Sequence, residues 1–355
     1  MNNQTILKDD STKRNGIIDV LRFLGLSLII LAHTNPNEYI FQLRNFDVPL
    51  MFIVMGMSYN ITSSKQRTKV SYITSRFRRI ILPTWIFLAL IFTACYLCYL
   101  TFNLSKFHFT QYEILSSFSL ARGIGYVWVI RLFFAVSVIA VLAPKRIYQV
   151  NIFVIYLASF LVIAMSDNLL GDWYKEIDHR NDILLLGSFY SNVIPYTLIF
   201  LIGTKLLNCT SKQLYLLLLI SLLIFSVVVV YNFLMSSTLY PTQTDKYPPG
   251  IYYISYSFFM SLLSLIAIRK IKLIYKLANI KAVIFISSNS IWIYLWHIVF
   301  VMITDKTSIW FIWRYLLVYA CAIIIFLIQY KLITLWTKKL NDAKIKKIIT
   351  SIFTG

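Results

Sequence analysis

Two ionisable residues mark the first long apolar segment of the chain, and their spacing defines the kind of site that could use both. Arg22 lies near the start of the apolar run from 17 to 32, and His33 follows eleven residues after Arg22. Ionisable groups in a membrane-spanning helix are costly, so they usually face a cavity where they do chemistry or transport. At about 1.5 Å per residue, the two groups lie about 16 Å apart along the helix axis. A site that includes both is long, and a narrow ligand crossing the bilayer would suit it.

The composition predicts the element that must position these residues. The chain has 355 residues, of which 59% are hydrophobic and only 14% charged. This is typical of an all-α polytopic membrane protein. We expect one transmembrane domain over 17–337, between an N-terminal tail (1–16) and a basic tail (338–355), with the first helix retained because no cleavage site follows it. The ten expected spans are 17–35, 46–62, 82–102, 126–143, 147–166, 183–204, 213–235, 251–268, 282–303 and 309–331.

The distribution of charge predicts the orientation. The net charge is +20, and 24 of the 34 Lys and Arg residues fall on one side when alternate loops are assigned to opposite sides. Most acidic residues fall on the other side. The positive-inside rule therefore predicts cytoplasmic N- and C-termini in the cytoplasmic (inner) membrane. The basic residues then face membrane lipid, and nucleic acid is not an expected partner.

The segments between the spans carry further expectations. Residues 63–81 are predicted to form a basic amphipathic helix on the inner leaflet, and Pro83 suits a helix start. Residues 166–182 and 236–250 are predicted to be external loops, the first acidic and the second rich in proline. No metal site or disulfide framework is expected, because the four cysteines lie in or beside spans: Cys95, Cys98, Cys209 and Cys321.

Five polar or amphipathic residues from four spans are predicted to lie at one depth near the external face. They are His33, Trp128, Arg131, His297 and Arg314. Two histidines and two arginines in one layer indicate a site. The alternative is that the arginines reach outward to lipid headgroups and the histidines pair locally. The sequence leaves both interpretations open for His297 and Arg314.

The inner layer is different, because it is dominated by arginines. Asp19 and Arg22 are three residues apart and are expected to form a helix-surface pair. Arg76, Arg78 and Arg79 follow the amphipathic segment. A juxtamembrane cluster of this kind usually anchors a protein to anionic lipid. Its alternative role is to hold phosphate groups, for which the guanidinium fork is well suited.

Several runs together resemble the membrane acyltransferase-3 family. They are IDVLRFLGLSLIILAH (18–33), FDVPLMFIVMG (46–56), RFRRIILP (76–83), WVIRLFF (128–134), FLIG (200–203) and SIWIYLWH (290–297). The first matches the family's D-x-x-R motif followed by a histidine, and the third its R-x-R-R-x-x-x-P element. The chain departs from the family at Met55-Gly56-Met57, where Ser-Gly-Phe is usual, so we assign Gly56 no direct role.

The resemblance implies a reaction and roles for these residues. Members move acyl groups, usually acetyl, from cytoplasmic acyl-CoA to hydroxyls of extracytoplasmic glycans. By this resemblance, Arg76, Arg78, Arg79 and Asp19 would belong to the acyl-CoA site, with Arg22 guiding its arm. His33 would act as the general base, and Arg131 or Arg314 would stabilise the oxyanion. A mechanism in which His33 is itself acylated first stays open.

Two other functions fit the same composition. A polysaccharide flippase or transporter would also have about ten spans, but it usually has broken helices in matching halves, and only Pro195 interrupts a span here. A glycan polymerase would share the membrane and the acceptor, such as O-antigen, capsule or exopolysaccharide. It would need neither the arginine cluster nor acetyl-CoA, so dependence on acyl-CoA separates it from an acyltransferase.

Overall fold

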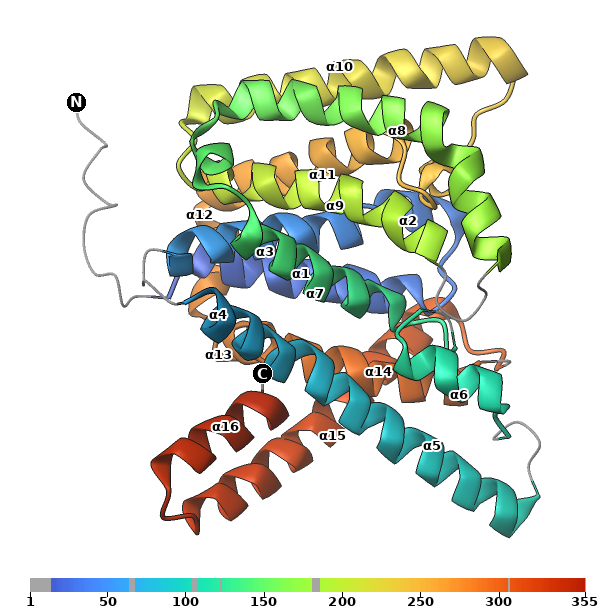
Figure 1. Cartoon of the computed structure of the whole chain (residues 1–355), viewed down its shortest axis with the longest axis vertical. Helices are drawn as coiled ribbons and strands as arrows, with labels where there is room; N and C mark the ends of the chain where they lie inside the picture. The colour runs from blue at the N-terminus through green and yellow to red at the C-terminus, as the bar shows by residue number, and fades with distance from the viewer. Residues whose placement is uncertain are drawn as a thin grey trace.

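The computed structural model is a bundle of α-helices (Figure 1). It describes residues 14–63, 68–103, 108–121, 123–180, 186–305 and 307–354. The α-helices are α1 (Gly16–Ala32), α2 (Glu38–Leu43), α3 (Asp47–Ser63), α4 (Lys69–Arg76), α5 (Leu82–Phe102), α6 (Gln111–Phe118), α7 (Trp128–Leu142), α8 (Ile152–Arg180), α9 (Leu186–Leu206), α10 (Ser211–Ser236), α11 (Ile251–Lys270), α12 (Lys272–Tyr275), α13 (Lys281–Ser288), α14 (Ser290–Thr304), α15 (Phe311–Lys338) and α16 (Ala343–Phe353). A π-helix, η1 (Phe77–Ile81), joins α4 to α5, and short 3₁₀ turns η3 (Lys145–Gln149), η4 (Thr242–Asp245) and η5 (Lys276–Asn279) connect other helices.

The all-helical prediction is confirmed for the described residues, and the protein is a multi-pass membrane protein by the length and apolarity of its helices. Six helices are long and apolar enough to cross a membrane, or seven when α13 and α14 count as one bent span. Helices also occur at the other expected spans, but α7 and the apolar part of α8 (152–166) are shorter. The expected count of ten and the cytoplasmic assignment of the termini stay predictions.

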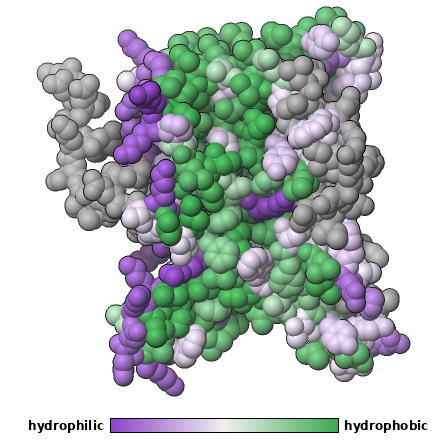
Figure 2. Space-filling view, viewed as in Figure 1, coloured by the Kyte–Doolittle hydropathy of each residue, from purple (hydrophilic) through white to green (hydrophobic). Residues whose placement is uncertain are grey.

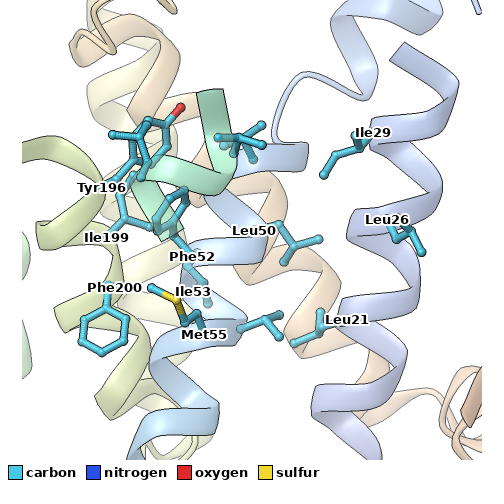
Figure 3. Close-up of a cluster of buried hydrophobic side chains, with 14 of the residues drawn as sticks. Leu21, Leu26, Ile29, Leu50, Phe52, Ile53, Met55, Tyr196, Ile199 and Phe200 are labelled. Atoms are coloured by element: carbon cyan, nitrogen blue, oxygen red, sulfur yellow. The ribbon is translucent and has the colours of Figure 1, made fainter. Parts of the chain in front are cut away.

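The centre of the bundle is formed by α1, α3 and α9 (Figure 3). Leu50 of α3 turns toward α1, whereas Phe52 on the same helix turns toward α9. Phe52 stacks on Tyr196 of α9 with ring centroids 4.5 Å apart. Both rings are fully buried. The first helix is therefore held against the core along its length, which fixes the positions of Arg22 and His33.

Two glycines bring α3 and α9 into backbone contact. A Cβ on Gly56 would lie 2.2 Å from the carbonyl oxygen of Phe200, and one on Gly203 would lie 2.4 Å from that of Ile53. Small residues allow such close approach between membrane helices. Packing, rather than chemistry, accounts for glycine in both the 46–56 and the 200–203 runs.

Helices α10 and α15 lie at the periphery. Only 17% and 22% of the residues in their most apolar windows are buried, against 72% for the segment 38–62 that contains α3. Figure 2 shows apolar side chains over most of the visible face, with hydrophilic side chains gathered along the edge where α4, α12 and α16 lie. This edge carries described parts of the basic loops that the sequence grouped on one side.

One segment expected to be an irregular loop is helical. Helix α8 continues to Arg180, so most of the predicted external loop 166–182 is helix, because no proline interrupts it and its residues are mostly compatible with a helix. The expected helix start at Pro83 is confirmed, because α5 begins at Leu82 with Pro83 in its first turn, although α4, η1 and α5 follow one another without a break from Lys69 to Phe102. The π-turn precedes Pro83, whose missing N–H removes one helix hydrogen bond.

The end of the chain is a docked helix. Helix α16 packs against α15, η1 and α5. The indole N–H of Trp292 donates to the carbonyl of Ile352 at 2.8 Å, and the amide of Gln329 donates to that of Phe353 at 2.8 Å. The segment 338–355 therefore includes a helix fixed to the membrane domain.

Candidate functional site: a histidine pair at the end of an arginine-lined cavity

His33 and His297, which lie 264 residues apart in the sequence, form a hydrogen bond in the structure. Nδ1 of His33 lies 2.9 Å from Nε2 of His297. His33 follows the last residue of α1, and His297 lies in the middle of α14. His297 has no exposed surface, whereas His33 keeps some. The structure thus joins two of the five residues predicted for the outer layer and leaves His33 as the more accessible of the pair.

The hydrogen-bond partners determine where the protons of the pair lie. Nδ1 of His297 contacts the backbone carbonyl of Tyr294, which can only accept, so this nitrogen carries a proton. In the neutral ring, Nε2 of His297 is then an acceptor, and it accepts a hydrogen bond from the protonated Nδ1 of His33. Neutral His33 therefore has its lone pair on Nε2. This is the state that a general base requires, and the tautomer follows from the network of contacts.

Tyr126 completes the immediate surroundings of His33. Its ring meets that of His33 edge-on, with centroids 4.7 Å apart. Its carbonyl accepts a hydrogen bond from the Tyr294 hydroxyl, which links it to α14. Gly125, with φ +80°, provides the left-handed turn that brings Tyr126 to this place. Tyr126 could not be found from the sequence, because it lies outside the motifs that resemble the family.

A cavity of about 230 Å³ lies on the inner side of the histidine pair. Arg22, Arg76 and Arg79 line one part of it. Ile29 and Tyr294 line another part; they are one helical turn from His33 and His297 respectively. The cavity therefore lies between the predicted inner and outer layers. Arg78, the third arginine of the predicted cluster, is not among its lining residues.

The start of α14 also faces this cavity. Helices α13 and α14 meet at a bend of 83°. Ser288, Ser290 and Ile291, on either side of the bend, line the cavity. Asn289, the residue before the helix, makes no side-chain cap hydrogen bond. The first N–H groups of α14 and its positive dipole end are therefore available at the same cavity as the arginines, a combination that favours an anion.

Asp19 positions the inner layer and does not line the cavity. It is almost fully buried, accepts a hydrogen bond from Ser287 at 2.9 Å, and binds the Arg14 guanidinium. Its expected partner Arg22 lies 4.0 Å away, at the limit of an ion pair, and donates instead to Ser58 at 2.9 Å. Asp19 thus ties α1 to α13, and Arg22 stays on the cavity wall.

The other three predicted outer residues have separate surroundings. Trp128 packs edge-on against Tyr247, with centroids 5.3 Å apart. The Arg131 guanidinium lies 4.1 Å above the Phe189 ring. Arg314 is buried, donates to Thr304 at 3.1 Å and lies 3.6 Å from Asp305. Arg314 therefore holds the end of α14, and the structure places Arg131 against Phe189 of α9.

Sequence reasoning missed a buried ionic cluster beside the pair. Arg44 and Asp47 form an ion pair at 2.8 Å, and Lys246 lies 3.5 Å from the same carboxylate. All three are at most 4% exposed. Their charges act on His33. Burial lowers the pKa of Lys246, and the Asp47 carboxylate opposes that shift. No spacing rule could have found a cluster whose members come from the α2–α3 connection and from a loop about 200 residues later.

These features define a polytopic membrane protein with a histidine site inside its helical bundle. No group of three or more His, Cys, Asp or Glu residues suited to a metal occurs in the described ranges. The arginine-lined cavity and the uncapped helix start favour a phosphate-containing ligand on the inner side.

The comparison with known families agrees with this class. Residues 15–331 match the family model described as an acyltransferase domain (Acyl_transf_3). The chain belongs to the acyltransferase-3 family of membrane acyltransferases, as its motifs predict. Searches of curated proteins and of solved structures returned no significant match.

Proposed function

We propose that this protein moves an acyl group, most simply acetyl, from cytoplasmic acyl-CoA to a hydroxyl of an extracytoplasmic or lipid-linked surface glycan. One observation carries the proposal. A single cavity has Arg22, Arg76 and Arg79 on its wall and comes within one helical turn of the His33–His297 pair. This arrangement suits a donor whose charged end and reactive end are far apart.

The inner part of the cavity would hold the phosphates of acyl-CoA. Charge-assisted bonds from Arg76 and Arg79, together with the free N–H groups of α14, favour phosphate oxygens. Arg22 would contact the arm between the phosphates and the thioester. The remaining wall is mainly apolar and includes Leu26, Ile29 and Val129, which suits an extended pantetheine arm.

At the outer end, His33 would act as the general base. Nε2 of His33 takes the proton of the acceptor hydroxyl while the oxygen of that hydroxyl attacks the thioester carbonyl. The tetrahedral intermediate then collapses, the C–S bond breaks, and the CoA thiolate takes the proton back from His33. His297 keeps His33 in the required tautomer, because its Nε2 accepts a hydrogen bond from the protonated Nδ1 of His33.

The test is acyl transfer by the purified protein in nanodiscs, followed by NMR of the glycan. We expect His33→Ala to lower transfer by about 10²-fold or more, the usual contribution of a general base. His108→Ala is the matched control, because His108 is exposed and packs on Tyr99 away from the pair. Substantial transfer by folded His33→Ala protein would refute the role of His33. Unchanged acylation with altered glycan amount or length would favour export or polymerisation.

A further inference from the structure

The buried cluster beside the histidine pair carries an unbalanced charge. Arg44 and Lys246 are cationic, and they share one carboxylate, that of Asp47. Buried charges are costly unless each is paired and hydrogen-bonded. The three residues together leave about one positive charge, which acts on His33 from nearby. A base that must gain a proton is opposed by this charge unless a negative group also enters the site.

The hydrogen-bond capacity of the two cations is also incomplete. Nε of Arg44 is buried and has no hydrogen-bond partner. The Lys246 ammonium lies 3.5 Å from Asp47 and 3.5 Å from the Asn45 side chain, both at the long limit of a hydrogen bond. An ammonium group has three donors, and Lys246 makes no short bond with either acceptor. The cluster therefore has the charge and the donors to receive an anion.

Neighbouring residues hold Lys246 in this place. The loop before α11 is tied to α2 and to the α2–α3 connection through Thr242, whose hydroxyl accepts from Gln42 at 3.0 Å and from Asn45 at 2.9 Å. The rings of Tyr247 and Tyr253 each lie 5.6 Å from the ammonium. Lys246 therefore belongs to a loop, but its neighbours hold its ammonium group at one position inside the core.

An aromatic pair lies beside the cluster. Tyr247 is 53% exposed and meets Trp128 edge-on. Aromatic side chains of this kind pack against the apolar faces of sugar rings. The Lys246 ammonium lies 5.6 Å from the centroid of the Tyr247 ring, so this exposed ring borders the buried cation. The pair and the cluster together match a sugar that carries a negative group.

We propose that Arg44, Asp47 and Lys246 form an anion-binding subsite for a carboxylate or phosphate carried by the acceptor glycan. The inference rests on the proposed function, because it concerns the acceptor of that reaction. The bound anion balances the cluster, and it offsets the positive charge that His33 acquires as it takes the proton of the hydroxyl. A neutral glycan would lack this contribution.

The first test is binding, which needs no activity. The melting temperature of the purified protein is measured in sodium phosphate and in sodium chloride of equal ionic strength, in an Arg76→Gln/Arg79→Gln background that removes the inner phosphate site. We expect phosphate to raise the melting temperature of that protein and of its Lys246→Arg derivative, but not of its Lys246→Met derivative. Lys145→Met is the matched control, because Lys145 is an exposed lysine that lines a separate cavity. An equal rise with Lys246→Met, or no rise in any protein, would overturn the subsite.

Sugar probes then identify the source of the anion. Methyl glucuronide, methyl glucoside 6-phosphate and neutral methyl glucoside differ only at one position. Stabilisation by either charged sugar that Lys246→Met abolishes supports the subsite and identifies its anion. Equal stabilisation by the neutral sugar would overturn it.

Kinetics separate this inference from the proposed function. With the native glycan, we expect Lys246→Met to raise the acceptor KM about tenfold or more with little change in kcat. A fall in kcat at unchanged KM would assign Lys246 to the transition state and overturn the subsite. If acyl transfer occurs but no anion binds, only the subsite fails. If anions bind through Lys246 and no acyl transfer occurs, only the proposed function fails.

Discussion

Two charged regions flank the histidine pair, and they are built in opposite ways. The inner region places Arg22, Arg76 and Arg79 on the wall of an open cavity, with Arg79 exposed. The outer region packs Arg44, Asp47 and Lys246 into the core with at most 4% of their surface exposed. The inner region can therefore exchange a ligand with solvent, whereas the outer region is almost fully shielded from water.

The difference teaches what each region contributes. Exposed arginines contribute little to stability, so their presence on a cavity is best explained by a ligand. Buried charges affect stability and chemistry together, because each interacts strongly in a low-dielectric surrounding. Substitutions in the inner region should therefore change binding alone, whereas removal of the shared carboxylate from the outer region should change folding first.

The largest expected effect is loss of stability in Asp47→Asn. This change leaves Arg44 and Lys246 buried without a carboxylate, and breaking a buried ion pair costs about 3–5 kcal/mol. We expect a marked fall in melting temperature and in folded yield, measured by thermal unfolding in detergent.

The matched variant is Lys246→Met, which leaves the Arg44–Asp47 pair balanced. It should fold at least as well as the unchanged protein. A large loss of stability in Lys246→Met, or none in Asp47→Asn, would contradict the unbalanced charge of the cluster.

The second effect concerns the inner region. Arg76→Gln/Arg79→Gln should raise the KM or Kd for acyl-CoA by about 100-fold or more, because each arginine loses a charge-assisted hydrogen bond that contributes about 1.5–3 kcal/mol. The melting temperature without ligand should change little. Calorimetric titration with CoA measures the affinity, and Arg78→Gln, outside the cavity lining, is the control. An equal loss in the control would indicate a general electrostatic effect.

A smaller effect is the dependence of stability on pH. Burial lowers the pKa of Lys246 in the folded protein. The pKa of an unfolded lysine is about 10.4. Between the lowered pKa and this one, the unfolded chain binds more protons than the folded protein, so the free energy of unfolding rises with pH. The groups that face Lys246 are Arg44, Asp47, Tyr247 and Tyr253, and burial raises the pKa of Tyr247, which keeps it neutral.

The measurement is the melting temperature of the unchanged protein relative to Lys246→Met at pH 7 and pH 10. Relative to Lys246→Met, the melting temperature of the unchanged protein should be a few degrees higher at pH 10 than at pH 7. A relative loss would mean that the lysine is stabilised in its charged form.

The smallest expected effect is that of salt. Raising ionic strength from about 0.05 to 0.5 M shortens the screening length from over 10 Å to a few Å. Affinity for CoA at the exposed arginines should fall several-fold, while the stability difference between Asp47→Asn and the unchanged protein should stay constant. A salt-dependent difference would place the outer cluster in contact with water.

The sequence predicted the inner region and the histidine pair better than the outer cluster. Arg22 and His33 lie on one helix, so helical rise alone relates them, and His297 follows from the depth of its span. Lys246 was expected in an external loop, and only tertiary structure brings it to Asp47. Tyr126 depends on a left-handed turn that has no local motif. Helix α16 was missed because a short basic tail has the composition of a lipid anchor, although its carbonyls bind Trp292 and Gln329.

The docking of α16 has a practical consequence for handling this protein. Its last described residues lie on Trp292, five residues before His297 on the same helix, and they lie beyond the family match at 15–331. A purification tag or fluorescent fusion attached after residue 355 would be tethered near the start of α14, which faces the arginine-lined cavity. An affinity handle before residue 14 would leave this contact undisturbed, and it is the better choice for every assay described above.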